Sequence, residues 1–279
     1  MTKRRRATQE QTKRTTQIVA GPSPAGTEEQ TPPAQPTAGD SQGKDESYFR
    51  ARDNEHRAEK RAVARCIVEN YLNEGDSILL DAGSSLYPIA QVMAKKAQTQ
   101  PGRTHYTVMT HNYKAFEELV KVPRGANLNI VLAGGRYDQD LHALFGNQAV
   151  NAYNDFFPRV VLIGISGFVA EIGLFCHGNT EEFAVKEAIF GKRARDRIIV
   201  ADHTKIGLLD GFKFGGSPKL LAEVDRCIVV TDAPPGGAPL SMRELFMKQT
   251  QVLETQGVLV KVVEVTDEER RAVEAEPAK

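Results

Sequence analysis

Apolar and polar positions follow two different periods along most of this chain. From residue 77 onward, short runs rich in β-branched residues are separated by longer stretches in which apolar residues recur every three or four positions. Short runs of this kind are typical of strands buried on both faces, and the longer stretches are typical of helices with one apolar face. Strands are predicted near residues 77–81, 106–110, 128–133, 160–165, 197–201, 227–231 and 258–265.

Helices are predicted between these strands and ahead of the first one. They cover residues 48–73, 86–97, 113–121, 142–153, 181–195 and 241–255. Regular alternation of strand and helix indicates an α/β fold, with a mostly parallel, Rossmann-like sheet and helices on both faces. We expect one domain over residues 47–265, followed by a charged, frayed C-terminal tail over residues 266–279.

Residues 1–46 have a different composition from the rest of the chain. The cluster Lys3-Arg4-Arg5-Arg6 opens this segment, five prolines interrupt it, and its large aliphatic residues beyond Met1 are Ile18 and Val19. Burying such side chains yields roughly 1.5–3 kcal/mol each, whereas ordering the backbone costs about 1–2 kcal/mol per residue. The segment is therefore predicted to be a disordered basic and Pro-rich tail. Its basic cluster could contact phosphates or act as a targeting signal, and a solvated tail is the favoured interpretation.

Composition narrows the class of protein. The 279 residues include 36 basic and 36 acidic side chains, so the net charge gives no global attraction to nucleic acid or to an anionic membrane. The apolar runs are too short to span a bilayer, and the N-terminus has no apolar signal region, so a cytoplasmic protein is expected. Cys66, Cys176 and Cys227 are scattered and have no metal-ligand spacing, which predicts reduced, buried thiols and no metal site.

The turn after the first predicted strand is the main candidate for chemistry. It reads Asp81-Ala82-Gly83-Ser84-Ser85 and leads directly into a predicted helix. Backbone amides at a helix N-terminus, helped by serine hydroxyls, form a natural site for a phosphate. On this stretch alone, an ordinary strand–helix turn with a serine cap is the favoured alternative.

Four later strands also end in small, polar or charged residues, and parallel strands bring such turns to one edge of the sheet, where ligands bind. Lys186, about two turns into the next helix, adds a possible cation, although a solvated surface lysine is an equal alternative. The four later turns read Thr110-His111-Asn112, Gly134-Gly135-Arg136, Gly164-Ile165-Ser166-Gly167 and Ala201-Asp202-His203-Thr204-Lys205.

These motifs together resemble the C-terminal sensor domain of DeoR/GlpR-type bacterial transcriptional regulators, over about residues 48–232. Each motif is weak alone, and their order over the whole stretch makes the resemblance specific. The matching pieces are Phe49-Arg50-Ala51-Arg52, Glu59-Lys60, Asp81-Ala82-Gly83-Ser84-Ser85, Thr110-His111-Asn112, Ala133-Gly134-Gly135, Gly164-Ile165-Ser166-Gly167-Phe168, Glu171-Ile172-Gly173-Leu174, Ala184-Val185-Lys186 and Ala201-Asp202-His203-Thr204-Lys205-Ile206-Gly207.

The resemblance implies a fold like that of ribose-5-phosphate isomerase and the coenzyme A transferases, self-association, and a phosphorylated sugar as effector, with no cofactor. It implies that Gly83, Ser84 and Ser85 hold the phosphate. Asp81 and Thr110 end the first two strands and belong to the same candidate set. The rest of the site is implied to be lined by Asn112, Gly135, Ser166, Gly167, Glu171, Lys186, Asp202 and Lys205.

Three roles follow from side-chain chemistry beside the resemblance. Lys186 and Lys205 supply positive charge to an anionic ligand. Asn112 and Asp202 are expected to meet sugar hydroxyls, and Asp202 alternatively orients Lys205. His203 is expected to be a hydrogen-bonded structural histidine rather than a base.

The chain departs from the family at its N-terminus. Regulators of this family carry a winged helix-turn-helix of about fifty residues there, whereas residues 1–46 hold no apolar pattern for a recognition helix with a core beneath it. The resemblance therefore does not carry over DNA binding through a folded reader. Any contact with DNA is expected only through the basic tail or through a partner.

A sugar-phosphate isomerase is the alternative function. Isomerisation needs a carboxylate base beside the sugar carbon, and the turn over residues 164–167, which carries acids in the related isomerase, carries none here. Glu171 and Glu182 remain as candidate bases. We therefore favour a non-catalytic sensor over an isomerase.

Overall fold

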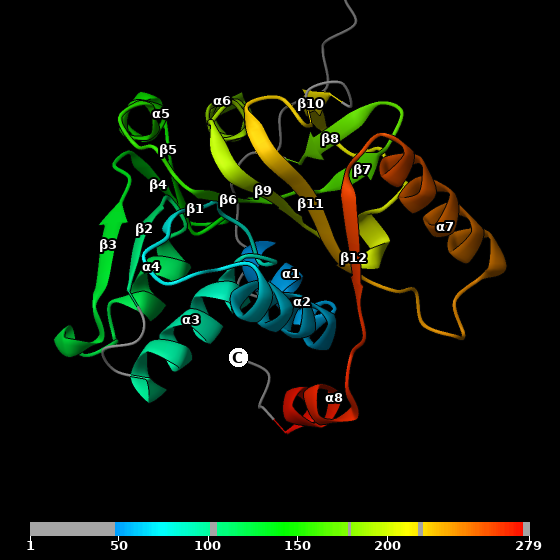
Figure 1. Cartoon of the computed structure of the whole chain (residues 1–279), viewed down its shortest axis with the longest axis horizontal. Helices are drawn as coiled ribbons and strands as arrows, with labels where there is room; N and C mark the ends of the chain where they lie inside the picture. The colour runs from blue at the N-terminus through cyan, green and yellow to red at the C-terminus, as the bar shows by residue number, and fades with distance from the viewer. Residues whose placement is uncertain (1–47, 101–104, 178–179, 217–219, 276–279) are drawn as a thin grey trace, which may run out of the picture. The chain divides into compact units, whose positions relative to one another are not determined.

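Seven strands form one parallel sheet at the centre of the described structure (Figure 1). This computed structural model describes residues 48–100, 105–177, 180–216 and 220–275, and the predicted tail over residues 1–46 lies outside them. All seven predicted strands are confirmed, and each neighbouring pair in the sheet is parallel. From edge to edge they are β12 (Leu259–Val263), β11 (Val224–Asp232), β9 (Ala194–Val200), β6 (Val160–Gly164), β1 (Ser77–Leu80), β2 (Tyr106–Thr110) and β3 (Leu128–Leu132).

The order of the strands contains one reversal. The chain builds outward from β1 through β2 to β3, then returns to place β6 on the other side of β1, and continues outward through β9, β11 and β12. Loops leaving the carboxyl ends of β1 and β6 therefore turn in opposite directions. A crevice opens at such a reversal in parallel sheets, and ligands bind there.

Helices cover both faces of the sheet because side chains alternate along each strand. Ile78 and Leu80 point into a core with α2 (Arg57–Asn70), α3 (Tyr87–Thr99) and α4 (Tyr113–Leu119). Leu79, between them, points into the opposite core with α5 (Asn147–Asn154), α6 (Thr180–Phe190) and α7 (Leu240–Thr255). Figure 1 shows the two helical layers on either side of the sheet. The predicted fold class is confirmed.

Five short strands outside the main sheet were not predicted. β4 (Arg136–Asp138) and β5 (Ala143–Phe145) form a hairpin, and β7 (Gly167–Val169), β8 (Gly173–Cys176) and β10 (Phe212–Gly216) form a small antiparallel sheet. Strands of three to five residues have too few positions to show a two-residue period. The pairing of β8 with β10 also joins segments far apart in sequence, whereas β4–β5 and β7–β8 are local pairs.

Three predicted helix boundaries were wrong. The expected helix over residues 48–73 is divided at His56, whose φ of 52° is left-handed, into α1 (Tyr48–Asn54) and α2. The helix expected from residue 142 begins at Asn147, because residues 143–145 pair with β4. The helix expected to reach residue 195 ends at Phe190, because Ala194 already pairs with Val224 of β11.

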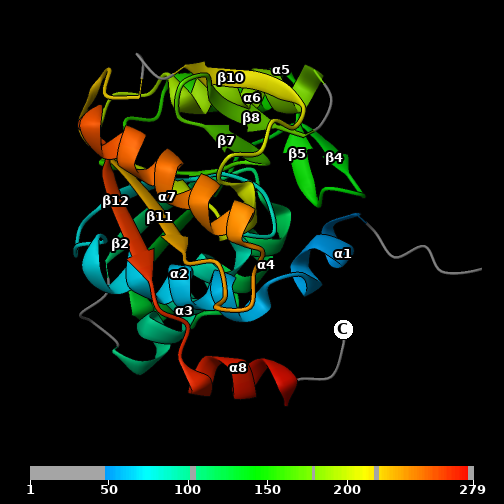
Figure 2. The same ribbon diagram turned by 90° about the vertical axis from the view of Figure 1, so that its right-hand side faces the viewer.

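Residues 267–274, which were predicted to be frayed, form a helix. α8 (Asp267–Glu274) begins with a capping box, in which Thr266 and Glu269 cap each other's backbone. Arg65 of α2 donates to Glu269 at 2.9 Å and fixes α8 beside α2 (Figure 2). This contact joins residues about 200 positions apart, so no local pattern could indicate it. Residues 276–279 lie outside the described part.

Two further findings concern composition. The three cysteines are free and buried, as predicted. No helix among the described residues combines the length and apolarity that crossing a bilayer would require.

Replacing Leu79 with alanine should destabilise the protein by about 2–5 kcal/mol, because the side chain is fully buried in a central strand and its removal leaves a cavity. Leu259→Ala on the edge strand β12 is the matched control. This side chain is 51% exposed, and its loss should cost less than about 0.5 kcal/mol. Denaturant unfolding of both variants measures the difference, and equal losses would contradict the assigned core.

Candidate functional site

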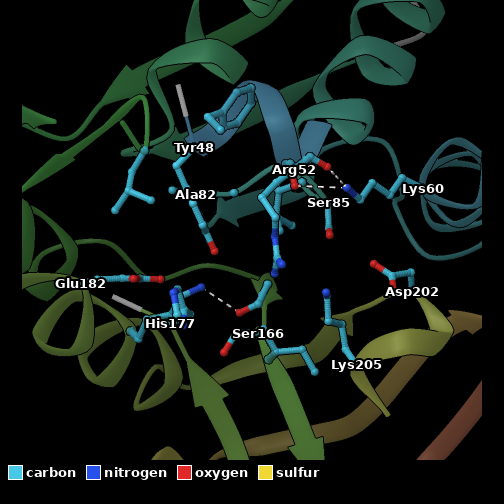
Figure 3. Close-up of a pocket in the computed structure, with 18 of the residues that line it drawn as sticks. Tyr48, Arg52, Lys60, Ala82, Ser85, Ser166, His177, Glu182, Asp202 and Lys205 are labelled. Carbon is cyan, nitrogen blue, oxygen red and sulfur yellow. Dashed lines mark hydrogen bonds between the residues drawn. The ribbon is translucent and has the colours of Figure 1, made fainter. Parts of the chain in front are cut away.

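A cavity opens at the carboxyl ends of β1 and β6, where the strand order reverses. Its empty volume is about 760 Å³, including the mouth that opens to solvent. The turn after β1 and residues 164–166 after β6 form the floor, and Tyr48, Arg52 and Lys60 from α1 and α2 line the cavity beside the turn. Figure 3 shows Arg52, Lys60 and Ser85 on one side of this space and Ser166 and Lys205 on the other.

Asp81 holds the floor together. Its carboxylate accepts hydrogen bonds from the amide of Ala82 at 2.8 Å and from the amide of Gly164 at 2.9 Å, so it ties the end of β1 to the end of β6. An added Cβ at Gly164 would lie 2.5 Å from Cδ2 of Leu86, so a larger residue here would require that side chain to move. The turn then passes through Gly83, whose φ of 124° is left-handed and favours glycine.

Lys186 of α6 completes this floor from below. Its ammonium donates to Asp81 Oδ2 at 2.6 Å and to the Gly164 carbonyl at 2.7 Å. Burial alone would lower the pKa of Lys186, but the carboxylates of Asp81 and Glu182 raise it above its ordinary value. The alternative of a solvated surface lysine is therefore wrong.

A neutral histidine lies behind the same carboxylate. His111 Nε2 is 3.6 Å from Asp81 Oδ1, and its Nδ1 is 2.7 Å from the hydroxyl of Tyr153. Burial lowers the pKa of His111 to about 4 despite the nearby acid. Within the described part of the chain, Lys186 is thus the charged partner of Asp81.

The open side of the turn suits an anion. Among the described residues, no acceptor takes a hydrogen bond from the backbone amides of Ser84 and Ser85. Lys60 of α2 donates to the Ser84 hydroxyl at 3.2 Å and also to the Arg52 carbonyl. Burial lowers the pKa of Lys60 to about 8, and the nearby Asp202 limits that fall. An ammonium and two amides therefore meet at this end of the cavity.

Asp202 and Lys205 lie on the same side, after the end of β9. Asp202 caps the short 3₁₀ helix His203–Lys205 by accepting from the Thr204 amide at 3.1 Å. Burial favours its neutral form, but Lys205 and the Thr204 hydroxyl hold the pKa of Asp202 below its usual value. Burial also lowers the pKa of Lys205. His203 is hydrogen-bonded, as expected, with Nδ1 2.6 Å from Asp232 Oδ2.

The far end of the cavity is acidic and aromatic. Figure 3 places Glu182 and His177 on the side opposite Lys60, Asp202 and Lys205. Burial raises the pKa of Glu182 to about 7, although Lys186 opposes that shift. Tyr48 stacks on His177, with ring centroids 5.8 Å apart. The cavity therefore offers cations at one end and a titratable acid at the other.

The structure brings about half of the predicted site residues to this cavity. The lining includes Gly83, Ser84, Ser85, Ser166, Lys186, Asp202 and Lys205. Ser166 is partly committed to the protein, because its hydroxyl donates to the Asp210 carbonyl at 2.8 Å. Ligand contact by these residues stays a prediction.

Three more predicted residues lie just behind the lining and support it. Asp81 is the floor carboxylate described above. Thr110 accepts from the amide of Asn112 at 3.0 Å, and Asn112 caps α4 by accepting from the Ala115 amide at 3.0 Å. The side-chain amide of Asn112 also donates to the Gly83 carbonyl at 3.4 Å. These groups shape the turns, and Asn112 is used by the protein rather than presented to a sugar hydroxyl.

The remaining three predicted residues lie outside the lining. A Cβ at Gly135 would lie 2.3 Å from the Phe145 carbonyl oxygen, and one at Gly167 would lie 2.3 Å from the Leu208 carbonyl oxygen, so both glycines permit close backbone approach. Glu171 is exposed in the turn after β7 and accepts from Gln249 of α7 at 3.0 Å. Of the two candidate bases, Glu182 alone reaches the cavity.

The lining residues that were not predicted include Tyr48, Arg52, Lys60 and His177. Arg52 and Lys60 belong to motifs that carry the family resemblance. They were not assigned to the site because they precede the first strand, and ligand sites were sought only in turns that follow strands. Among the described residues, no group of three or more His, Cys, Asp or Glu side chains is suited to a metal ion.

Comparison with known families gives one match that covers most of the described chain. Residues 55–232 match the model of the DeoR C terminal sensor domain. The transcriptional repressor AccR of Agrobacterium fabrum is 29% identical over 150 residues, which are 54% of each chain. The HTH-type transcriptional repressor GlcR of Bacillus subtilis is 24% identical over 180 residues, 64% of this chain and 62% of that protein. The chain thus spans about half the length of the curated relatives it matches.

Solved structures resemble the chain only partly. Ribose 5-phosphate isomerase A from Neisseria gonorrhoeae aligns with a TM-score of 0.36 and 15% identity, over 52% of each chain. A D-ribose-5-phosphate isomerase in complex with phospho-erythronic acid aligns with a TM-score of 0.37 and 14% identity, also over 52% of each chain. At this level of similarity we draw nothing about activity from them.

Lys186→Met should destabilise the protein by roughly 3–5 kcal/mol, because it leaves the Asp81 carboxylate buried without its ammonium. Combining it with Asp81→Asn should cost less than the sum of the two single losses, since the second change removes the stranded charge. Lys121→Met is the control. It breaks an exposed pair with Glu118 and should cost less than about 1 kcal/mol. Strict additivity in denaturant unfolding would contradict the buried pair.

Glu182→Gln should remove a pH dependence of stability. The pKa of Glu182 is about 7 in the folded protein, whereas the ordinary value for a glutamate is 4.5. Between these two pH values the folded state therefore binds one more proton at this carboxyl than the unfolded state does. Raising the pH from about 4.5 to 7 therefore costs stability, by as much as roughly 3 kcal/mol.

The measurement is denaturant unfolding at pH 5 and pH 8. Glu182→Gln should lose less stability across this interval than the wild type does, and the difference is fully present above pH 7. Glu181→Gln, which changes the half-buried neighbour on the same helix that pairs with Arg136, should keep the wild-type dependence. Parallel curves for wild type and Glu182→Gln would show that this carboxyl titrates normally.

Proposed function

The chain belongs to the DeoR C terminal sensor domain family, and on this premise we propose that its cavity binds a phosphorylated sugar, or a related phosphorylated metabolite, as a regulatory effector. One observation carries the proposal. The turn after β1 presents two backbone amides and the Ser84 hydroxyl to a cavity that Lys60 and Lys205 also line. Amides at a helix N-terminus together with ammonium groups form a favourable environment for a phosphate.

The phosphate would bind between the Ser84 hydroxyl and the Lys60 ammonium, in place of the direct hydrogen bond between them. In the present structure the Lys60 ammonium is held by the Ser84 hydroxyl and the Arg52 carbonyl. A dianion at the turn would accept from the same ammonium and raise the lowered pKa of Lys60 toward its ordinary value. Binding of a phosphate would thus be communicated directly to the C-terminal end of α1.

The sugar would extend from the phosphate toward the acidic end. Asp202 offers a carboxylate oxygen close to the proposed phosphate position, and Glu182 offers another at the far side. Carboxylates accept hydrogen bonds from sugar hydroxyls, and a buried acceptor discriminates strongly against a ligand that lacks the matching hydroxyl. Identity of the sugar would accordingly be read by these two acids.

We propose a regulator of transcription rather than an enzyme. The matched relatives are named as repressors, and one of the two acids considered as bases, Glu171, lies outside the cavity. Effector binding would change the affinity of the regulator for DNA, through a partner or through residues 1–46, which lie outside the described structure. Self-association and a cytoplasmic location fit this proposal. An isomerase remains the second candidate, because Glu182 combines a position in the cavity with a pKa of about 7.

A panel of phosphorylated sugars should raise the melting temperature, whereas the same sugars without phosphate should not. A ligand at a hundred times its Kd stabilises the folded state by about 2.7 kcal/mol. Ser84→Asp should abolish the shift, since it places a carboxylate where the phosphate would bind. Ser241→Asp, the same substitution at an exposed position on α7, should leave the shift intact.

Analysis of the ligand after incubation separates the two candidate functions. Full recovery of unchanged sugar phosphate supports a sensor. Turnover that disappears in Glu182→Gln would replace the sensor with an isomerase. Absence of any melting shift across the panel, in wild type and Ser84→Asp alike, would remove the proposed ligand class.

A further inference from the structure

The side of α7 that faces away from the sheet carries two large apolar residues. Phe246, Gln249 and Leu253 are the buried residues of this helix, so they define its inner face. Leu240 and Met247 lie on the opposite side, where they are 61% and 60% exposed. Figure 2 shows α7 at the surface of the molecule, with the sheet behind it. Both apolar side chains are thus presented to solvent from one helix.

A pair of opposite charges lies between these two residues. Leu240 and Met247 are seven positions apart, so they lie nearly in line along the helix. Arg243 and Glu244 come between them, and both are exposed. With about 100° of rotation per residue, Arg243 lies about 50° to one side of this line and Glu244 about 50° to the other. These four residues are called the outer stripe of α7 below.

The charges of the outer stripe have no role within the described part of the protein. Among the described residues, no hydrogen bond or ion pair engages the side chain of Arg243 or Glu244. Water solvates both groups, so neither needs a partner for stability. Their arrangement is informative instead. Single exposed apolar residues are ordinary, whereas two that frame opposite charges form a pattern that a partner surface can match.

A second copy of this chain carries the matching pattern. Two copies of α7 can lie side by side in the same direction about a two-fold axis, and each residue then meets its counterpart at the same height. Leu240 packs on the partner's Leu240, and Met247 packs on the partner's Met247. The flanking charges cross, so Arg243 faces the partner's Glu244. Symmetry forms the same ion pair a second time.

The opposite orientation is disfavoured by the same charges. In an antiparallel pair, each flank of the stripe meets the same flank of the other copy. Arg243 would then face the partner's Arg243, and Glu244 would face the partner's Glu244. Like charges placed opposite each other in an interface are destabilising. The charges of the outer stripe therefore select the parallel arrangement.

We propose that the outer stripe of α7 binds the outer stripe of a second copy, so that the chain forms a parallel, two-fold symmetric pair through this helix. Four apolar side chains and two ion pairs make a small contact beside the roughly 1,600 Å² of a standard interface. The association is accordingly reversible and concentration-dependent. No residue of α7 is in the described lining of the effector cavity, so this contact does not rest on the proposed function.

Disulfide trapping with the full chain tests the contact directly. The three native cysteines are buried, so an exposed cysteine introduced on α7 reacts selectively. Leu240→Cys and Met247→Cys should each form a covalent dimer on mild oxidation, seen by non-reducing electrophoresis. Ser241→Cys is the matched control, because it is exposed on the same helix. It lies about 110° away from the stripe and should form a dimer at least about tenfold more slowly, since its thiols are not held together.

A mixture of the two stripe variants reports the orientation. Positions 240 and 247 are about 10 Å apart along the helix, so a parallel pair links each position to itself. Mass spectrometry of the linked peptides should therefore find few links between position 240 of one copy and position 247 of the other. An antiparallel pair would give mainly these mixed links.

Charge reversal gives an independent test by sedimentation velocity at increasing protein concentration. Arg243→Glu and Glu244→Arg should each weaken the association at least about tenfold, because each variant places like charges opposite each other. In a mixture of the two variants every charge again faces its opposite, so association should return to the wild-type strength. Lys95→Glu, at an exposed position on α3, makes the same change in net charge as Arg243→Glu and should associate as the wild type does.

The melting temperature of each variant separates lost association from lost folding, because all these positions except the two apolar ones carry solvated polar groups and should melt as the wild type does. Three outcomes would overturn the proposal: trapping of Met247→Cys no faster than that of Ser241→Cys, mainly mixed links between positions 240 and 247, or no recovery of association in the mixture of charge variants. Ser84→Asp should associate normally. A failure of the sugar-phosphate experiments would leave these results unchanged.

Discussion

The buried pair between Lys186 and Asp81 is the interaction on which the site depends. It joins α6 to the ends of β1 and β6, because the ammonium contacts both the carboxylate and the Gly164 carbonyl. A buried charge is tolerated only when its partner is fixed at hydrogen-bonding distance. The same contacts that satisfy this requirement also hold the turn after β1 in position. The geometry of the cavity floor is therefore a consequence of neutralising one buried aspartate.

The cavity at the carboxyl ends of β1 and β6 mixes cations with the acids Asp202 and Glu182, a combination that suits a ligand with both a phosphate and hydroxyl groups. Lys60 belongs to the cationic end, and its hydrogen bond to the Arg52 carbonyl attaches it to α1. A change in the contacts of this one lysine would therefore reach both the turn at Ser84 and the end of α1.

Much of the fold follows from local patterns, and much of the site does not. Seven short apolar runs predicted seven parallel strands, and the turn around Ser84 became a candidate because four later strands also end in small, polar or charged residues. Gly135, Gly167 and Glu171 were assigned to the site because they lie in motifs matched to a family. The two glycines are needed for backbone contacts with Phe145 and Leu208. A motif shows that a residue type is required, without showing whether a ligand or the backbone requires it.

The amino-acid sequence by itself determined the alternating strands and helices, the parallel sheet and the edge at which the cavity opens. These features depend on the spacing of apolar residues within one element and on the rule that parallel strands end at a common edge. Only the tertiary structure decided that Lys186 meets Asp81, 105 positions away, and that Lys60 meets Ser84 across 24 positions. Such contacts arise when separate elements pack against each other. The packing of these elements selects which residues meet, and the local spacing of apolar residues in the chain does not predict those pairs.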